Sequence, residues 1–334
     1  MPKGWKFIVG SIFIGSATVY GLTKYFAGGV CKCNTRLDGQ WVIITGANSG
    51  IGKALAIELV KRGACLILAC RDLKKGLQAR VDIINEAKAP LDYHLNIHVK
   101  HLDLCSLVNI EIFAIGIKKE FPEIFALVNC AGVFYHPPEL TEDGFEVTFQ
   151  TNYLGPFILT HYLLPVLEKQ EHARIVNVAS EAHRRVNVYD LKAITTSPTE
   201  FRSPIVSYGV SKLALLLFTR ELAKLLLNKG TNVIVNAVNP GNVETAIFRH
   251  FPPLANPWMF ALQKPIRLLV VKTPEQGCQT LLHALLTSNR STGQYYSDCK
   301  LCLASPLATS DKISKDYYKV TLNLLKWHLN ESEC

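Results

Sequence analysis

The sequence predicts an α/β fold: a doubly wound, mostly parallel seven-stranded sheet with helices on both faces, plus an N-terminal membrane-anchor helix. Short apolar runs alternate with helix-forming segments at intervals of about 30 residues, the length of a strand, helix and strand unit. The first run, Val42 to Ile44, leads through a glycine-rich turn into the Ala-, Leu-, Glu- and Lys-rich segment 53–61, which is typical of a helix. Strands joined in this way pair in parallel through right-handed crossovers.

The expected strands are short and apolar, and helical segments fill the gaps between them. The strands lie near residues 41–45, 65–70, 97–102, 125–130, 173–179, 233–238 and 294–297. Segment 244–272, rich in Phe, Pro, Trp, Leu and Arg, interrupts the alternation after the sixth strand. Beyond Cys302 the chain is polar, and its one amphipathic pattern predicts a helix from Asp311 to His328.

Length and composition predict one main domain with appendages. With 334 residues and 49% hydrophobic content, the chain can bury a full-sized core. We expect an anchor and linker at 1–36, the main domain at 37–304 and a helical tail at 305–334. The net charge of +9 contains no run of five like charges, which favours a solvated basic surface over a nucleic-acid-binding patch.

The stretch Phe7 to Thr23 carries no charge and is flanked by lysines, at the short end of the range for a transmembrane helix. A cleaved signal peptide is the alternative, but no small-x-small cleavage site precedes the charged segment. Positive charge is nearly balanced across the stretch, so it gives no orientation. We expect an uncleaved single-pass anchor in the endoplasmic reticulum membrane, with the mitochondrial inner membrane as the alternative.

Ten cysteines are scattered along the chain, and several fall inside expected core strands, so buried free thiols are favoured over a disulfide framework. Cys31-x-Cys33 and Cys299-x-x-Cys302 have the spacing of metal-binding pairs. No histidine-rich partner accompanies them at zinc-site spacing, so we expect no metal. Palmitoylation of Cys31 and Cys33, next to the anchor, is an alternative.

The turn from Thr45 to Gly52 has the features of a dinucleotide-binding site. Its glycines follow the spacing G-x-x-x-G-x-G between a strand and a helix. Glycine lets the backbone turn sharply and approach a pyrophosphate, while the free N–H groups and the dipole of the following helix face the phosphates. A tight turn alone uses the same residues, but the flanking strand and helix favour the binding site.

Tyr208 and Lys212 are placed to act together. Residues four apart lie on one face of a helix, so the phenol and the ammonium group can point into one cleft. Tyrosine with an ordinary pKa near 10 is a poor acid–base catalyst at neutral pH, and a nearby cation lowers that pKa. Most Tyr-x-x-x-Lys pairs on helices are surface pairs, so other residues must decide the role.

The motif TGANSGIG at its spacing resembles the short-chain dehydrogenase/reductase family, and the resemblance runs from roughly Gln40 to Tyr296. Within that family the motifs LACRD, TEDGFE, YGVSKLALLLFTREL and NPGNVET, with the N-terminal anchor, look most like the retinol dehydrogenase branch, membrane-bound NADP-dependent enzymes acting on retinoids. The sequence departs from the branch in NCAG for NNAG, in Ala179 for Ser and in Asn239 where His precedes Pro240. None of these changes removes a catalytic group.

The resemblance implies a catalytic set of Asn152, Ser180, Tyr208 and Lys212. Tyr208 would pass a proton to or from the substrate oxygen, which Ser180 would hold. Lys212 would lower the pKa of Tyr208 and bind the nicotinamide ribose, and Asn152 would hold a water linking Lys212 to solvent. The implied cofactor-binding residues are Thr45, Gly46, Asn48, Ser49, Gly50, Ile51, Gly52, Arg71, Asp103, Leu104, Asn129, Ala131, Gly132, Tyr208, Lys212, Pro240, Gly241, Val243 and Thr245.

The end of the second strand predicts which cofactor is used. An NAD site needs a carboxylate for the ribose 2′-hydroxyl, whereas an NADP site needs a cation for the 2′-phosphate. In the family that it resembles, the acidic position is filled here by Cys70, and Arg71 matches the basic position. NADP(H) is therefore expected, although Asp72 keeps NAD(H) as an alternative.

Segment 244–272 is expected to be a substrate lid, because it follows the sixth strand at the edge of the sheet where ligands bind. Its apolar residues can cover a greasy substrate while its cations meet anionic head groups. Core packing over the sheet is the alternative. The apolar residues are Phe248, Phe251, Leu254, Trp258, Met259, Phe260, Leu268 and Leu269, and their basic neighbours are Arg249, Lys264, Arg267 and Lys272.

The expected function is hydride transfer between nicotinamide and an apolar alcohol, aldehyde or ketone, with the retinal/retinol pair as the expected substrate. The alternatives are a reductase of steroids, prenyl alcohols or lipid aldehydes, and a non-catalytic NADP-binding membrane scaffold. The expected partners are the apolar substrate and the membrane, with a homodimer as a candidate assembly and no nucleic acid.

Overall fold

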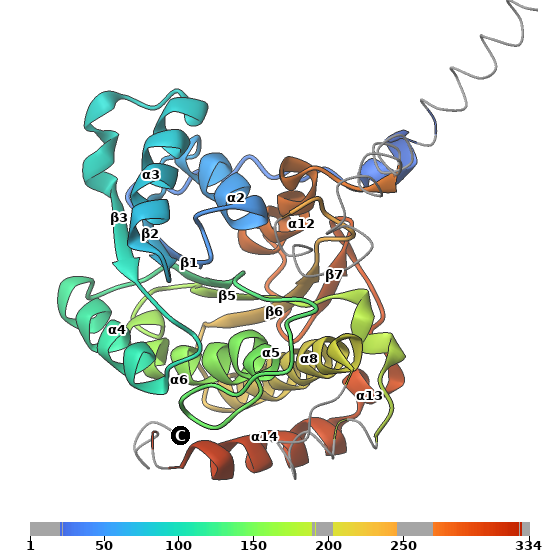
Figure 1. Cartoon of the computed structure of the whole chain (residues 1–334). Helices are drawn as coiled ribbons and strands as arrows, with labels where there is room; N and C mark the ends of the chain where they lie inside the picture. The colour runs from blue at the N-terminus through green and yellow to red at the C-terminus, as the bar shows by residue number, and fades with distance from the viewer. Residues whose placement is uncertain are drawn as a thin grey trace, which may run out of the picture.

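The computed structural model describes residues 21, 23–188, 191, 203–245, 270–326 and 328. Their centre is a sheet in the order β3-β2-β1-β4-β5-β6-β7-β8, parallel except for its last pair (Figure 1). The strands are β1 (Trp41–Thr45), β2 (Cys65–Cys70), β3 (Ile97–His101), β4 (Ala126–Asn129), β5 (Arg174–Val178), β6 (Ile234–Asn239), β7 (Tyr295–Ser297) and β8 (Lys300–Leu301). The first seven confirm the strands that the sequence predicts.

The eighth strand corrects the predicted strand number. β8 pairs antiparallel with β7 through a turn at Asp298 and Cys299, whose φ angles are +50° and +59°. Two exposed residues are too few to show the alternation that marks a strand, so no pattern predicted β8.

Helices cover both faces of the sheet and confirm the doubly wound class. On one face lie α2 (Gly50–Val60), α3 (Leu73–Ala87) and α12 (Pro274–Leu286), and on the other lie α4 (Leu107–Glu120), α6 (Gly155–Leu167) and α8 (Pro204–Asn228) (Figure 1). Shorter helical segments are η1 (Leu91–Asn96), α5 (Val147–Phe149), the π-helix η2 (Gln150–Leu154), η3 (Glu181–Arg185) and α13 (Pro306–Thr309).

Two apolar cores lie on the two faces, and β1 contributes to both. Val42 and Ile44 pack under α2, whereas Ile43 belongs to the core shared with α4, α6 and α8. Successive side chains of a strand point to opposite faces, so a strand covered on both sides must be apolar throughout. This is why the buried strands read as continuous apolar runs.

The C-terminal helix α14 (Asp311–Leu325) begins where the sequence predicts and ends three residues earlier than predicted. It packs against α8, and its inner face belongs to the core. The Tyr153 and Thr321 hydroxyls are 2.6 Å apart, and Tyr318 Oη is 2.7 Å from His161 Nε2. These bonds join α14 to buried residues of η2 and α6.

Two predicted features fall mostly outside the described residues: the anchor stretch Phe7 to Thr23, and the lid, of which 246–269 are not described. Within the part of the chain that is described, no helix has both the length and the hydrophobicity needed to cross a bilayer.

Candidate active site

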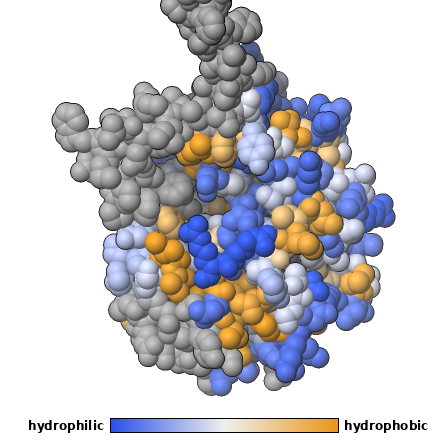
Figure 2. All heavy atoms as spheres, turned by 90° about the vertical axis from the view of Figure 1, so that its right-hand side faces the viewer, coloured by the Kyte–Doolittle hydropathy of each residue, from blue (hydrophilic) through white to orange (hydrophobic). Residues whose placement is uncertain are grey.

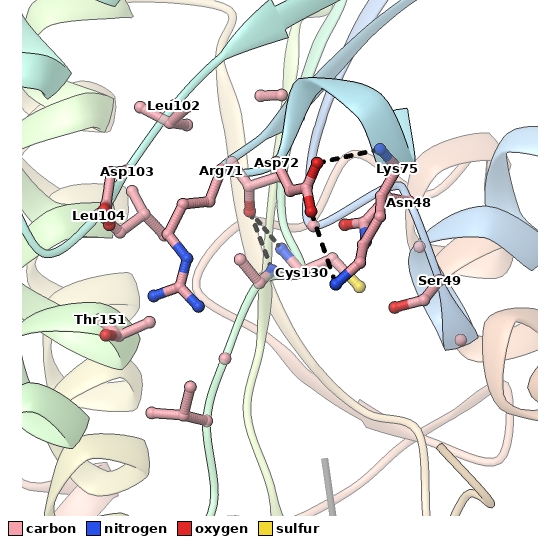
Figure 3. A pocket seen from close by; sticks show the side chains of 18 of the residues that line it. Asn48, Ser49, Arg71, Asp72, Lys75, Leu102, Asp103, Leu104, Cys130 and Thr151 are labelled. Carbon is pink, nitrogen blue, oxygen red and sulfur yellow. Dashed lines mark hydrogen bonds and ion pairs between the residues drawn. The ribbon is translucent and has the colours of Figure 1, made fainter. Parts of the chain in front are cut away.

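A pocket lies at the carboxyl ends of the parallel strands, the edge at which open α/β sheets bind ligands (Figure 3). The turn after β1 and the ends of β2, β3 and β4 form its walls, with Thr151 of η2. The predicted cofactor residues that line it are Thr45, Gly46, Asn48, Ser49, Gly50, Ile51, Gly52, Arg71, Asp103, Leu104, Ala131, Gly132 and Thr245.

The glycine turn is shaped to take a phosphate group. Gly46 and Gly50 have φ angles of +68° and +54°, a region that side chains other than glycine rarely occupy. A Cβ atom at Gly46 would lie 2.9 Å from the Ala131 backbone, and one at Gly52 would lie 2.7 Å from the Gly46 carbonyl oxygen. Among the described residues, Ser49 makes no side-chain cap on the start of α2. The first N–H groups of α2 are therefore available to an anion, which fits the pyrophosphate of a dinucleotide.

Thr45 joins the glycine turn to the loop after β4. Its hydroxyl accepts from the backbone N–H of Cys130 at 3.0 Å and of Ala131 at 2.9 Å. The loop is thereby held against the turn, with Gly132 facing the catalytic residues: a Cβ there would lie 3.1 Å from Asn152 Oδ1 and 3.6 Å from Lys212 Nζ.

The end of the pocket that would receive the adenine ribose carries two cations. Arg71 lines it as the sequence predicts, and Figure 3 shows its side chain extending past Asp103 and Leu104 toward Thr151. Lys75, which the sequence analysis missed, also lines it. Asp72 is already engaged, because its carboxylate caps α3 by accepting from Lys75 N at 3.1 Å and pairs with Lys75 Nζ at 3.5 Å. Two cations and a paired carboxylate fit a 2′-phosphate better than a free 2′-hydroxyl.

The four predicted catalytic residues come together beside this pocket from three elements. Asn152, in η2, is buried; its Oδ1 accepts from Val133 N at 2.8 Å and its Nδ2 donates to Ser211 Oγ at 3.1 Å. Lys212 is also buried, and its Nζ donates to the Val178 carbonyl at the end of β5 (2.7 Å). The same Nζ lies 5.6 Å from the centre of the Tyr208 ring, one helical turn away.

Ser180 follows β5 and faces Tyr208, with which it forms a side-chain hydrogen bond. The Phe134 ring packs edge-on against Tyr208, with a centroid distance of 4.9 Å. Tyr208 therefore has a hydroxyl partner at its polar end and an aromatic ring beside it, an arrangement suited to a carbonyl carried by an apolar molecule.

Burial shifts both titratable groups of the set. It lowers the pKa of Lys212 to about 8, because the charged ammonium is removed from water. It raises the pKa of Tyr208, and the hydrogen bond with Ser180 only partly offsets this effect. This raised pKa is opposite in direction to the lowering by Lys212 that we expected, because burial dominates. The Lys212 ammonium donates to Val178 and not to the phenol. Tyr208 is thus a neutral phenol at neutral pH, the form that can donate a proton.

A residue that the sequence analysis missed supports Ser180. His183 Nδ1 lies 2.6 Å from the Ser180 carbonyl oxygen, and His183 Nε2 accepts from Ser305 N at 3.0 Å. Since a backbone N–H can only donate, the imidazole is neutral with its proton on Nδ1. Burial lowers the pKa of His183 and favours this neutral form. No local pattern could have indicated the bond, because Ser305 lies 122 residues away.

Asn129 lies at the end of β4, as predicted, but does not line the pocket. Its side chain points into the core, where Nδ2 donates to Asn177 Oδ1 at 2.8 Å and to Thr160 Oγ1 at 3.2 Å. Asn177 in turn donates to Thr219 of α8 at 2.9 Å. This buried network ties β4 and β5 to α6 and α8.

Of the stretch after β6, Thr245 lines the pocket, whereas the predicted cofactor residues Pro240, Gly241 and Val243 do not. Gly241 has a φ angle of +84°, and its N–H donates to Asn239 Oδ1 at 3.1 Å. Pro240 and Val243 are buried, and Val243 forms a parallel bridge with Lys272. Thr245 continues this stretch into the pocket, where a Cβ atom at Gly50 would lie 2.9 Å from its methyl group.

A family model described as short chain dehydrogenase matches residues 40–192. Retinol dehydrogenase 12 of Homo sapiens is 41% identical over 308 residues, which cover 91% of this chain and 92% of that protein. The chain belongs to the short-chain dehydrogenase family.

Solved structures agree with this placement. This short-chain dehydrogenase is similar to the crystal structure of an uncharacterized protein from Mycobacterium paratuberculosis, with a TM-score of 0.70 and 28% identity over 90% of this chain and 98% of that one. A short chain dehydrogenase from Escherichia coli CFT073, complexed with NADPH, gives a TM-score of 0.59 at 25% identity, covering 78% of this chain and 97% of that one. The short-chain dehydrogenase fold therefore accounts for the sheet, the glycine turn and the pocket together.

Proposed function

We propose that the protein is an NADP(H)-dependent oxidoreductase that transfers a hydride between nicotinamide and an apolar alcohol, aldehyde or ketone, with the retinal/retinol pair as its substrate. The observation that carries the proposal is the convergence of Asn152, Ser180, Tyr208 and Lys212 beside a pocket built to hold a dinucleotide. The similarity to retinol dehydrogenase 12 over nine tenths of the chain supports the choice of retinoid.

In this proposal the cofactor supplies the hydride and the chain supplies the rest. The Ser180 hydroxyl donates to the substrate oxygen and holds it next to Tyr208. The Tyr208 phenol donates its proton as the carbonyl is reduced and takes it back in the oxidation direction. Lys212, beside Tyr208, would bind the ribose that carries the nicotinamide ring. Asn152, bonded to both Val133 and Ser211, would hold a water that links Lys212 to solvent.

Arg71 and Lys75 would hold the 2′-phosphate of NADP(H), because both line the ribose end of the pocket while Asp72 caps α3. The pyrophosphate would lie on the glycine turn and the uncapped start of α2. NAD(H) lacks the 2′-phosphate and would gain nothing from these cations.

The membrane anchor at 7–23 and the lid at 244–272 belong to the same proposal. A Cβ atom at Gly28 would collide with Lys272 and Asp298, so the chain leaving the anchor lies beside the residue that ends the lid. The lid begins at the pocket, which Thr245 lines. Both segments would thus emerge at the carboxyl edge of the sheet, and a retinoid could pass from a bilayer to Tyr208 without crossing water. The endoplasmic reticulum is the proposed membrane, and a homodimer is a candidate assembly.

The test is NADPH consumption by the full chain in detergent with all-trans-retinal, a steroid ketone, a prenyl aldehyde and a medium-chain lipid aldehyde. Fastest turnover with retinal supports the proposal, while a preference for a steroid, prenyl or lipid aldehyde would replace the substrate but keep the reaction. Tyr208→Phe should abolish turnover and keep NADPH binding, because only the phenolic hydroxyl is lost. Wild-type rates in that variant, or cofactor binding without turnover in the wild type, would favour the non-catalytic scaffold.

A further inference from the structure

The linker that precedes β1 lies along one face of α12. Cys31 N donates to Gln279 Oε1 at 3.1 Å, and Thr35 Oγ1 donates to the Leu286 carbonyl at 3.2 Å. Gln279, His283 and Leu286 follow the spacing i, i+4 and i+7 of a single helical face. The linker is therefore part of the folded domain from residue 31 onward, and His283 lies in the middle of the strip that it covers.

Three metal-ligating side chains meet where the linker crosses His283. The sulfur atoms of Cys31 and Cys33 and a ring nitrogen of His283 all lie within 4.8 Å of one another. Cys33 Sγ is 4.0 Å from His283 Nδ1. Across a tetrahedral zinc ion, with Zn–S of about 2.3 Å and Zn–N of about 2.0 Å, sulfur and nitrogen ligands lie about 3.6 Å apart. Closing the site around an ion needs a movement of about 0.4 Å for this pair and of up to about 1 Å for a pair at the 4.8 Å limit, which half-buried side chains can make.

Cys299 lies outside this group of three and is a candidate for the fourth ligand. Its thiol is within electrostatic range of both Cys31 and Cys33, and a Cβ atom at Gly29 would lie 3.2 Å from Cys299 Cβ. Cys299 occupies the second central position of the β7–β8 turn with φ of +59°, where glycine or asparagine costs least. A cysteine at this position places a thiol next to the linker at some backbone cost.

We propose that Cys31, Cys33, His283 and Cys299 form a structural zinc site that fastens the linker to α12 and to the β7–β8 turn. Two or three thiolates with one imidazole are the donor set that zinc takes in closed structural sites. The cofactor pocket is lined by other residues, so the ion has no part in hydride transfer. Its effect is to hold residues 31–33 in place on the domain. It therefore fixes the point from which the N-terminal segment extends.

The sequence could not reveal this site. Cys33 and His283 are 250 residues apart, whereas the recognisable zinc motifs keep each ligand pair within a few residues. The Cys-x-Cys pair was visible, but the histidine that completes it comes from a helix whose packing the spacing does not encode.

The test measures zinc per chain in the full-length protein, purified in detergent under reducing conditions after growth with zinc. We expect about one zinc per chain in the wild type and about a tenth of that or less in Cys33→Ser and in His283→Ala. Cys302→Ser is the matched control, because it removes the other cysteine of the Cys299-x-x-Cys302 pair and should keep the metal. NADPH binding should persist in all variants, which separates loss of the ion from loss of the fold.

Cobalt substitution tests the ligands themselves. Co²⁺ in the wild type should show thiolate charge-transfer absorption and the strong visible bands of a tetrahedral site, and Cys299→Ser should lower the charge-transfer intensity. An unchanged spectrum in Cys299→Ser would remove Cys299 from the ligand set. Trypsin provides an independent readout: a zinc chelator should expose the bond after Lys32, between the two cysteines, to cleavage.

Zinc-free protein after growth with zinc, a stoichiometric disulfide or thioester at Cys31 or Cys33, or zinc that persists in His283→Ala would each overturn the proposal. These outcomes bear on the linker alone, because turnover with retinal is measured separately.

Discussion

His183 connects Ser180, a proposed catalytic residue, to the C-terminal part of the chain: its Nδ1 lies 2.6 Å from the Ser180 carbonyl oxygen, and its Nε2 accepts from the N–H of Ser305. Replacing it by Phe keeps a ring in the same space but removes both bonds. We expect kcat to fall about ten-fold or more, because Ser180 loses the contact that orients it, while the Kd for NADPH stays within about two-fold.

Steady-state kinetics and NADPH titration measure the two effects. Arg185→Gln, at an exposed position of the same 3-10 helix, is the control and should match the wild type. A His183→Phe variant with unchanged kcat would show that Ser180 needs no such support.

Arg71→Glu should weaken NADPH binding about ten-fold or more, because a charge-assisted contact with the 2′-phosphate becomes a repulsion. NADH binding should change much less, since NADH lacks that phosphate. Lys74→Glu is the matched control: Lys74 is an exposed cation in the first turn of α3, next to the pocket-lining Lys75. If Arg71→Glu keeps its preference for NADPH, the ribose end of the pocket has been assigned wrongly.

Lys212→Met should be inactive yet more stable than the wild type at pH 7, by about 1–3 kcal/mol. Burial lowers the pKa of Lys212 to about 8, below the value of about 10.4 in an unfolded chain, so folding at pH 7 must bury a charge. Between these two values the unfolded chain binds more protons, and the wild type gains stability as pH rises.

Urea unfolding at pH 7 and pH 9.5 should therefore show an advantage of Lys212→Met that shrinks at the higher pH. Lys229→Met, at the exposed end of the same helix, should show neither effect. A destabilised Lys212→Met would mean that the bond to Val178 outweighs the cost of burying the ammonium.

His161 should make the fold sensitive to acid. Its Nδ1 lies 2.7 Å from the Phe157 carbonyl and its Nε2 2.7 Å from Tyr318 Oη, and burial lowers its pKa to about 4. The unfolded chain, with a histidine pKa of about 6.5, takes up a proton first, so stability is lost as pH falls from about 6.5 toward 4. The wild type should lose up to about 3 kcal/mol more than His161→Phe over this range. Parallel stability curves for the two proteins would contradict the assignment.

The lid hypothesis can be tested at Trp258 and Phe260, in segment 244–272. Replacing both by Ser should raise the KM for a long apolar aldehyde and spare a small soluble carbonyl compound, because only the long substrate needs an apolar cover. An equal loss on both substrates would mean that the two rings pack as core.

Local patterns accounted for most of the fold. The apolar runs, the glycine turn and the four-residue spacing of Tyr208 and Lys212 each depend on neighbours in sequence, and the structure places these elements as expected. The eighth strand was missed because two exposed residues carry no period. The sequence around Asn129 indicated where β4 ends, but it could not show that the Asn129 side chain points into the core.

Long-range contacts were beyond reach for a different reason. Two contacts join residues more than a hundred positions apart: the hydrogen bond from Ser305 N to His183, and the approach of Cys33 to His283. Local patterns could not predict the raised pKa of Tyr208 either, since it depends on how deeply the ring is buried. Nor could they show that the Lys212 ammonium donates to Val178.

The hydrogen bonds between Tyr153 and Thr321 and between Tyr318 and His161 also bear on biosynthesis. Tyr153 and His161 are translated long before α14, so during elongation their buried polar groups lack the partners that α14 supplies. The core around η2 and α6 would therefore stay incompletely packed until α14 has left the ribosome. A truncating mutation upstream of Asp311 should therefore yield a chain that chaperones retain and proteases remove, even though every residue of the active site has been made.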